Sequence, residues 1–196
     1  MPATLPELPD GIRLCVRVPP EPADSDLEFA ARLGVEYVYV WLLENQLDAG
    51  TLFEGAVICR YLAAAEKSEL YPEDDYDRAV VDQWMDFFSQ HLGRWINTLY
   101  FENVVSPRMK REPKQESIDE AMGFATTQSE VVDKHLGENE YLCGANLTIA
   151  DPYAYAYLRA AENVGFSLDV YPNIVAWRDK LKARPDVQKA ESLVKD

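Results

Sequence analysis

Residues 141–151 read Tyr-Leu-Cys-Gly-Ala-Asn-Leu-Thr-Ile-Ala-Asp, and this stretch is the most informative one for the fold. Its last four residues, Thr148 to Asp151, have the form of a helix capping box. We expect the Thr148 hydroxyl to accept from the amide three residues on, and the Asp151 carboxylate to accept from the Thr148 amide. An aromatic turn with Gly144 precedes the box, and an apolar, tyrosine-rich segment follows it. The stretch therefore predicts the start of a buried helix.

The chain around this stretch is patterned for helices from residue 78 onward. Apolar residues recur there at helical spacing, and Gly or Pro interrupts the pattern between segments. We expect helices over 78–101, 116–136 (closed by Gly137), 148–163 and 172–184, a short terminal helix from Pro185, and a loop over 104–115 broken by Pro107 and Pro113. The buried stripe of the first helix is predicted as Val81, Trp84, Phe88, Leu92, Trp95 and Leu99.

The first part of the chain reads differently, as a strand, a helix and a second strand. Alternating residues over 12–18 and a β-prone run over 35–42 flank a candidate helix over 24–33. The two strands are therefore expected to be parallel neighbours. A short strand at 52–53 and a helix over 55–67 follow, whose buried stripe we expect to be Val57, Ile58, Tyr61 and Leu62. This organisation predicts an α/β domain over 1–67, a polar linker over 68–77 and an all-α domain over 78–196.

Composition excludes several classes of function. Acidic residues outnumber basic ones 34 to 19, which gives a formal charge of -15. Such a surface repels nucleic acid and anionic membranes, so neither is an expected partner. The three cysteines are far apart, and the two histidines are not close in sequence, so we expect neither a disulfide framework nor a metal site. Without a recognisable leader or a spanning apolar run, the cytoplasm is the expected compartment.

Five segments, in order along the chain, resemble the cytosolic glutathione transferases. They are 51–63, 70–72 with 78–84, 141–151, 171–177 and 183–185. The resemblance implies a two-domain α+β fold, in which a thioredoxin-like α/β domain precedes an all-α helical bundle. It also implies that the protein conjugates the thiol of its co-substrate glutathione to a small apolar electrophile, as in detoxification, and that the family's usual homodimer is possible.

The start of the helix at Glu54 and Gly55 is the expected glutathione-binding site. A helix N-terminus offers free amides and a positive dipole end, which suit a carboxylate. The resemblance implies that Glu54 meets the ammonium of the γ-glutamyl group and that the Gly55 amide meets its carboxylate. Gly55 lacks the hydroxyl that the family usually has there. The alternative is that Glu54 is only a helix-start carboxylate and Gly55 only a turn residue.

The sequence departs from the family pattern at two places. The family has a catalytic Ser, Tyr or Cys after its first strand, whereas this chain has Pro19-Pro-Glu-Pro22. Ser25, His91 and Arg94 are the remaining candidates to stabilise a thiolate, although Ser25 also suits a helix cap. In addition, only eleven residues separate Leu42 from Glu54 and none of them is proline. The family fits a helix, a strand and a cis-proline turn there, so we expect a shortened thioredoxin-like domain.

Aromatic residues concentrate on the long helix expected over 78–101. Trp84, Phe88, His91 and Trp95 are the candidates for an electrophile pocket. The alternative is that most of them belong to the core, as aromatic residues at helical spacing usually do. Gly55 lacks the family's usual hydroxyl, and the family's cis-proline turn is missing. These departures leave open a second function, in which a catalytically degenerate member of the same fold is a binding or dimerising scaffold. A third possibility is a replaced segment over 1–50.

Overall fold

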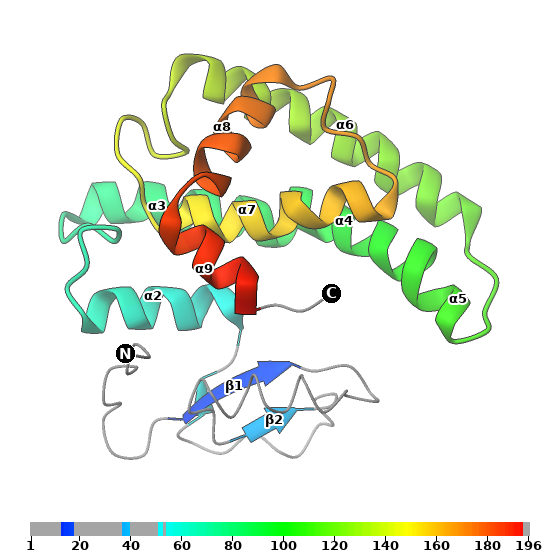
Figure 1. Ribbon diagram of the computed structural model, residues 1–196, viewed down its shortest axis with the longest axis horizontal. Coiled ribbons are helices and arrows are strands. Elements are labelled where there is room, and N and C mark those ends of the chain that lie inside the picture. The colour runs from blue at the N-terminus through cyan, green and yellow to red at the C-terminus, as the bar shows by residue number, and fades with distance from the viewer. Residues whose placement is uncertain (1–12, 18–36, 40–50, 53, 194–196) are drawn as a thin grey trace. The chain divides into compact units, whose positions relative to one another are not determined.

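The structure is a computed structural model that describes residues 13–17, 37–39, 51–52 and 54–193. The chain divides into two compact units (Figure 1). One unit comprises the residues before Lys67 together with those from Lys189, and the other comprises Lys67–Gln188. The domain boundaries expected from the sequence, at residues 67 and 77, stay predictions.

The first unit contains a three-stranded sheet of order β2-β1-β3. The strands are β1 (Arg13–Arg17), β2 (Tyr37–Tyr39) and β3 (Thr51–Leu52). Both pairings are parallel, with Cys15 opposite Tyr37 and Arg13 opposite Thr51. The expected strands and their parallel pairing are thus confirmed. The helix expected over 24–33 lies outside the described residues.

Helix α2 (Gly55–Ala65) follows β3 and confirms the expected helix. Its expected buried stripe is wrong, because Ala56 and Ala63 are buried while Val57 is 41% exposed. Ile58, Tyr61 and Leu62 are half-buried. The helix is apolar around most of its circumference, so the pattern of side chains did not define a single inward face.

The second unit begins with one long helical rod that runs from Asp75 to Arg108. It consists of α3 (Asp75–Phe87), a π-helical turn η1 (Phe88–Leu92), α4 (Gly93–Tyr100), a second π-helical turn η2 (Phe101–Val105) and α5 (Ser106–Arg108). The Asp74 carboxylate caps its start by accepting from the amides of Tyr76 (2.9 Å) and Asp77 (3.0 Å). The rod therefore begins three residues before the expected helix.

The rod also ends later than expected, because Pro107 does not stop it. Pro107 lies in the first turn of α5, where a missing amide is tolerated. The buried carboxylate of Glu102, in η2, accepts from the Ser106 hydroxyl (3.3 Å) and from the Lys114 amide (2.9 Å) beyond α5. One acidic side chain thus ties the end of the rod to the start of the next helix.

The buried stripe of the rod differs from the expected one at a single position. Val81, Trp84, Phe88, Leu92 and Leu99 are buried as expected, but Ile96 is buried in place of Trp95. The buried residues still follow one another at intervals of three or four, which is the spacing of one helical face. The Gly93 amide donates to the Phe88 carbonyl across η1. The wider π-helical turn therefore leaves the buried face continuous from α3 to α4.

Gly93 lies against helix α7 (Ala150–Ala161). A Cβ atom at Gly93 would lie 2.1 Å from the Phe88 carbonyl oxygen and 2.5 Å from Cδ1 of Tyr157. Both separations are far below van der Waals contact. The absence of a side chain at Gly93 therefore allows the Tyr157 ring of α7 to pack against the end of η1.

The remaining helices confirm the expected all-α organisation. They are α6 (Gln115–Glu138), α7, a 3-10 turn η3 (Glu162–Val164), α8 (Pro172–Lys182) and α9 (Pro185–Leu193). Gly137 does not close α6, since the helix continues to Glu138 and Gly137 is not among the positive-φ glycines. The Asn139 amide group instead donates to the His135 carbonyl at 2.9 Å, which satisfies a free carbonyl at the helix end.

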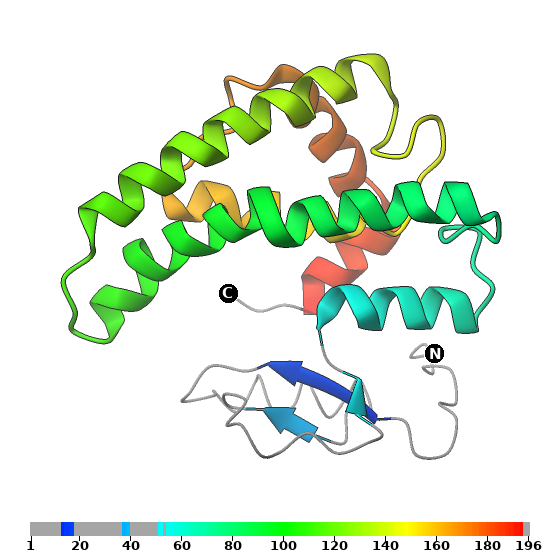
Figure 2. The same cartoon turned by 180° about the vertical axis from the view of Figure 1, so that it is seen from behind.

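Helix α7 is the centre of the second unit. Figures 1 and 2 show it between the long rod and α8, and it packs against α3, α4 and α8. Its inward face buries Ala150, Asp151, Ala154, Tyr155, Leu158 and Ala161. Tyr153 and Tyr157 contact each other through their hydroxyls at 3.2 Å. The tyrosine run of α7 therefore has a packing role.

Candidate functional site

Glu54 lies at the N-cap of α2, in an unusual backbone conformation. Its φ of 67° and ψ of 120° place it in a region that residues other than glycine rarely adopt. The side chain is exposed and makes no capping hydrogen bond to its own helix. Such backbone outliers persist where the surrounding structure requires them and are frequent at ligand sites. Gly55 opens the helix, whose first amides have no intrahelical acceptor.

The four candidates for an electrophile pocket do not form one cluster. Trp84 and Phe88 are buried in the core, where the centroid of the Trp84 ring lies 4.5 Å from the centroid of the His135 ring. His91 is exposed, with its ring centroid 5.5 Å from that of Phe87. Trp95 is half-buried and faces α6. Only His91 and Trp95 thus reach the surface.

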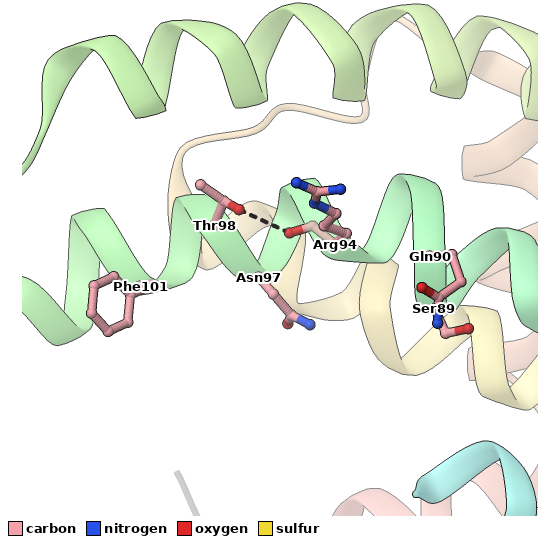
Figure 3. Close-up of a pocket in the computed structure, with 6 residues that line it drawn as sticks. All are labelled: Ser89, Gln90, Arg94, Asn97, Thr98 and Phe101. Carbon is pink, nitrogen blue, oxygen red and sulfur yellow. Dashed lines mark hydrogen bonds between the residues drawn. The ribbon is translucent and has the colours of Figure 1, made fainter.

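A hollow of about 390 Å³ lies on the exposed side of the rod (Figure 3). Five polar residues and one aromatic residue line it: Ser89, Gln90, Arg94, Asn97, Thr98 and Phe101. Figure 3 shows Arg94 and Thr98 projecting toward one side of the helix and Asn97 toward the other. The Thr98 hydroxyl donates to the Arg94 carbonyl at 3.1 Å, and that of Ser89 donates to the Asp86 carbonyl at 3.2 Å.

The hollow lies between the two π-helical turns. Ser89 and Gln90 belong to η1, and Phe101 is the first residue of η2. Such turns are rare and often occur at functional sites. The lining residues lie along the exposed side of the rod, whereas Leu92, Ile96 and Leu99 are buried on its other side.

Arg94 is the cation of this hollow and is supported by two stacked rings. Its guanidinium carbon lies 4.7 Å from the centroid of the Trp95 ring. Trp95 in turn stacks on Phe124 of α6, with centroids 4.6 Å apart and planes 9° apart. The three side chains form a shelf that joins α4 to α6.

Of the thiolate-stabilising candidates, only Arg94 lines the hollow. His91 is on η1 but is not a lining residue, and Ser25 lies outside the described residues. Sequence reasoning missed the other five lining residues. Their spacing places them on one helical face, and a polar face gives no local signal that separates a binding site from a solvated surface.

The capping stretch forms a buried polar cluster around Asp151, a side chain with no exposed surface. One carboxylate oxygen accepts from the Leu142 amide (3.0 Å) and the Trp177 indole (2.9 Å), and the other accepts from the Thr148 amide (3.0 Å). The reach of Asp151 back to Thr148 is confirmed. The Thr148 hydroxyl, however, accepts from the Ala150 amide (3.3 Å) rather than from Asp151, because the helix begins at Ala150.

Burial dominates the acid–base properties near this cluster. It raises the pKa of Asp151, against the lowering effect of the donors that surround the carboxylate. It also raises the pKa of the Cys143 thiol to about 11. Cys143 is therefore protonated at neutral pH and is a poor nucleophile there. Burial raises the pKa of Cys59 as well.

Two further properties concern the described residues only. No helix among them is long and apolar enough to cross a membrane. No three His, Cys, Asp or Glu side chains within them gather closely enough to hold a metal ion.

Known proteins match the chain in both sequence and fold. Residues 90–185 match the family model "Glutathione S-transferase, C-terminal domain". Glutathione S-transferase 1 of Zea mays is 31% identical over 147 residues, which cover 74% of this chain and 69% of the relative. The probable glutathione S-transferase GSTF2 of Oryza sativa subsp. japonica is 32% identical over 155 residues, with 76% and 72% covered.

Solved structures agree with these sequence matches. The maize glutathione S-transferase I in complex with an atrazine glutathione conjugate is 30% identical. It aligns with 72% of this chain and 68% of its own length, at a TM-score of 0.67.

Proposed function

The chain belongs to the cytosolic glutathione transferase family, and from this premise we propose that it conjugates the thiol of glutathione to a small electrophile. The observation that carries the proposal is the start of α2. There, the exposed Glu54 adopts a rare backbone conformation at the position that resembles the family's γ-glutamyl site. The likeness to named transferases of maize and rice supports the same function.

Glu54 and Gly55 are proposed to hold the γ-glutamyl end of glutathione. The Glu54 carboxylate would pair with the ammonium group, and the Gly55 amide would donate to the carboxylate at the positive end of the α2 dipole. Gly55 lacks a hydroxyl, so one hydrogen bond to a charged group is missing. Such a bond contributes about 1.5–3 kcal/mol, which corresponds to roughly ten- to hundredfold in affinity.

The sheet β2-β1-β3 and α2 are proposed to be a shortened thioredoxin-like domain over 1–67, joined by a linker over 68–77 to the all-α domain over 78–196. The parallel pairing of β1 with both neighbours supports this assignment. So does the short spacing between Leu42 and Glu54, which leaves no room for the family's additional helix and strand.

The chemical step is nucleophilic attack by the glutathione thiolate. The thiol releases its proton to solvent, the sulfur bonds to the electrophilic carbon, and the leaving group departs with its electron pair. Among the described candidates, Arg94 and His91 can stabilise the thiolate electrostatically. Ser25 is retained from the sequence as a third candidate.

His91 and Trp95 are the members of the expected electrophile pocket that we retain, since Trp84 and Phe88 are buried. The family resemblance further supports a homodimer, a cytoplasmic location and a role in detoxification. Neither a membrane nor a nucleic acid is proposed as a partner. The comparisons do not favour the alternative of a catalytically degenerate scaffold.

A calorimetric titration with reduced glutathione tests the proposal. Wild-type protein is expected to bind it in the micromolar-to-millimolar range, and Glu54→Ala to weaken binding roughly ten- to hundredfold. Glu66→Ala is the matched control, because Glu66 is an exposed glutamate at the other end of α2. Absence of heat at several millimolar, from protein with a helical circular-dichroism spectrum, would overturn the proposal.

A further inference from the structure

The hollow on the rod has a chemistry that does not match an apolar ligand. Within the residues that the structure describes, its lining offers one cation, two amide side chains, two hydroxyls and a single aromatic ring. None of these lining residues carries a carboxylate, in a chain whose formal charge is -15. A ligand there meets two amide groups and one positive charge, since both hydroxyls already donate to backbone carbonyls.

Arg94 is available to such a ligand. Among the described residues, no carboxylate lies within ion-pair distance of its guanidinium. The planar fork carries five donors and matches a carboxylate in a two-point geometry. Stacking over Trp95, which rests on Phe124, restricts its rotamers before any ligand arrives.

The backbone of the hollow is also held in place. The Tyr157 ring packs at Gly93, directly after η1, and leaves no room for a larger residue. Phe101 opens η2 and is 39% exposed, so its ring can contact a flat ligand. The cation and the ring therefore lie on one rigid segment, two helical turns apart.

We propose that the hollow binds an aromatic electrophile that carries a carboxylate or a similar anionic group. Arg94 binds the anionic group and Phe101 contacts the ring. This inference rests on the proposed function, because it names the class of the second substrate. It assigns Arg94 to the second substrate as a specificity-determining residue, which leaves His91 as the described candidate for the thiolate.

A matched pair of electrophiles tests the inference: 4-chloro-3-nitrobenzoate and its neutral methyl ester. Calorimetric titration without glutathione measures binding alone. We expect the wild type to bind the acid at least about tenfold more tightly than the ester, and Arg94→Gln to remove that preference. In the variant, binding of the ester should change far less than binding of the acid.

Arg108→Gln is the matched control, since Arg108 is an exposed arginine at the end of the same rod and outside the hollow. It is expected to retain the preference for the acid. Equal binding of acid and ester by the wild type would overturn the inference, as would a preference for the acid that survives in Arg94→Gln.

Turnover separates this inference from the proposed function. If the acid binds through Arg94 but glutathione neither binds nor reacts, the proposed function fails and the anion site remains. If Arg94→Gln lowers kcat/KM equally for acid and ester and raises the pH at which the glutathione thiol ionises, Arg94 stabilises the thiolate and the inference is overturned.

Discussion

Asp151 and Arg94 lie in the same helical unit, yet their surroundings differ in almost every respect. Asp151 has no exposed surface and accepts from Leu142, Thr148 and Trp177. Arg94 is exposed, and its guanidinium stacks on the Trp95 ring. A buried charge needs partners, and those partners occur in recognisable sequence patterns. An exposed charge needs none, so its surroundings leave little trace in the sequence. The comparison separates what maintains the fold from what is free to bind.

The largest effect is expected from Asp151→Ala. The substitution leaves the amides of Leu142 and Thr148 and the Trp177 indole buried without an acceptor. We expect a loss of about 3–5 kcal/mol in the free energy of unfolding, measured by urea denaturation. A loss below 1 kcal/mol would show that water replaces the carboxylate, and that the cluster is less important than its burial indicates.

Gly93→Ala should have the second-largest effect. The new methyl group overlaps the Phe88 carbonyl and the Tyr157 ring, so either η1 or α7 must move. We expect destabilisation of about 2–3 kcal/mol, together with weaker binding in the neighbouring hollow. The double variant with Tyr157→Ala should recover part of the stability. If it does not, the carbonyl contact is the dominant clash.

Thr148→Ala tests the smaller half of the capping box. It removes the hydroxyl that accepts from the Ala150 amide and donates to Asp151 at 3.4 Å, but keeps the bond from the Thr148 amide to Asp151. A lost N-cap typically destabilises by about 1 kcal/mol, and we expect that value from thermal or urea unfolding. An effect as large as that of Asp151→Ala would mean that the hydroxyl positions the carboxylate.

The pH dependence of stability should carry the signature of Asp151. Burial raises its pKa in the folded state above the value of about 3.9 in the unfolded chain. Between those two pKa values the folded state binds more protons, so the contribution of Asp151 to stability decreases as pH rises. The stability difference between wild type and Asp151→Asn should therefore shrink from pH 4 upward. A difference that grows with pH would mean a lowered pKa.

The smallest effect on stability is expected from Arg94→Gln. The side chain is exposed and, within the described part of the chain, stacks on Trp95 alone, so the change should be within about 0.5 kcal/mol. A larger loss, measured by urea denaturation, would show that the shelf maintains the packing of α4 against α6. That result would weaken the contrast with Asp151.

Strong local signals account for what could be predicted from the sequence. The capping stretch, the parallel strands and the helices are set by residue spacing and by caps. The π-helical turns were not predicted, because no local pattern in the sequence distinguishes them from α-helical turns. The burial of Ile96 in place of Trp95 was missed because both positions fit a helical spacing of three or four residues after Leu92, and the rod continues through Pro107 because that residue lies in the first turn of α5.

The candidate site was predicted only in part. Glu54, Gly55 and Arg94 were named from a family resemblance and from charge, whereas Asn97 and Phe101 carried no signal of their own. A polar helical face looks the same whether it contacts water or a ligand, so only the three-dimensional hollow distinguishes them. Ser25 lies outside the described residues and stays a prediction.

The π-helical turn η1 has a consequence for insertions and deletions along the chain. Such a turn holds one residue more than the α-helix that could replace it. Removing one residue from η1 would leave an ordinary α-helical turn and keep the faces of α3 and α4 in register, because the wider turn absorbs the additional residue. Removing one residue from α4 itself would instead rotate everything beyond it by about 100°. A single-residue gap among relatives is therefore expected to be tolerated at η1, whereas a gap elsewhere in the rod would exchange buried for exposed side chains.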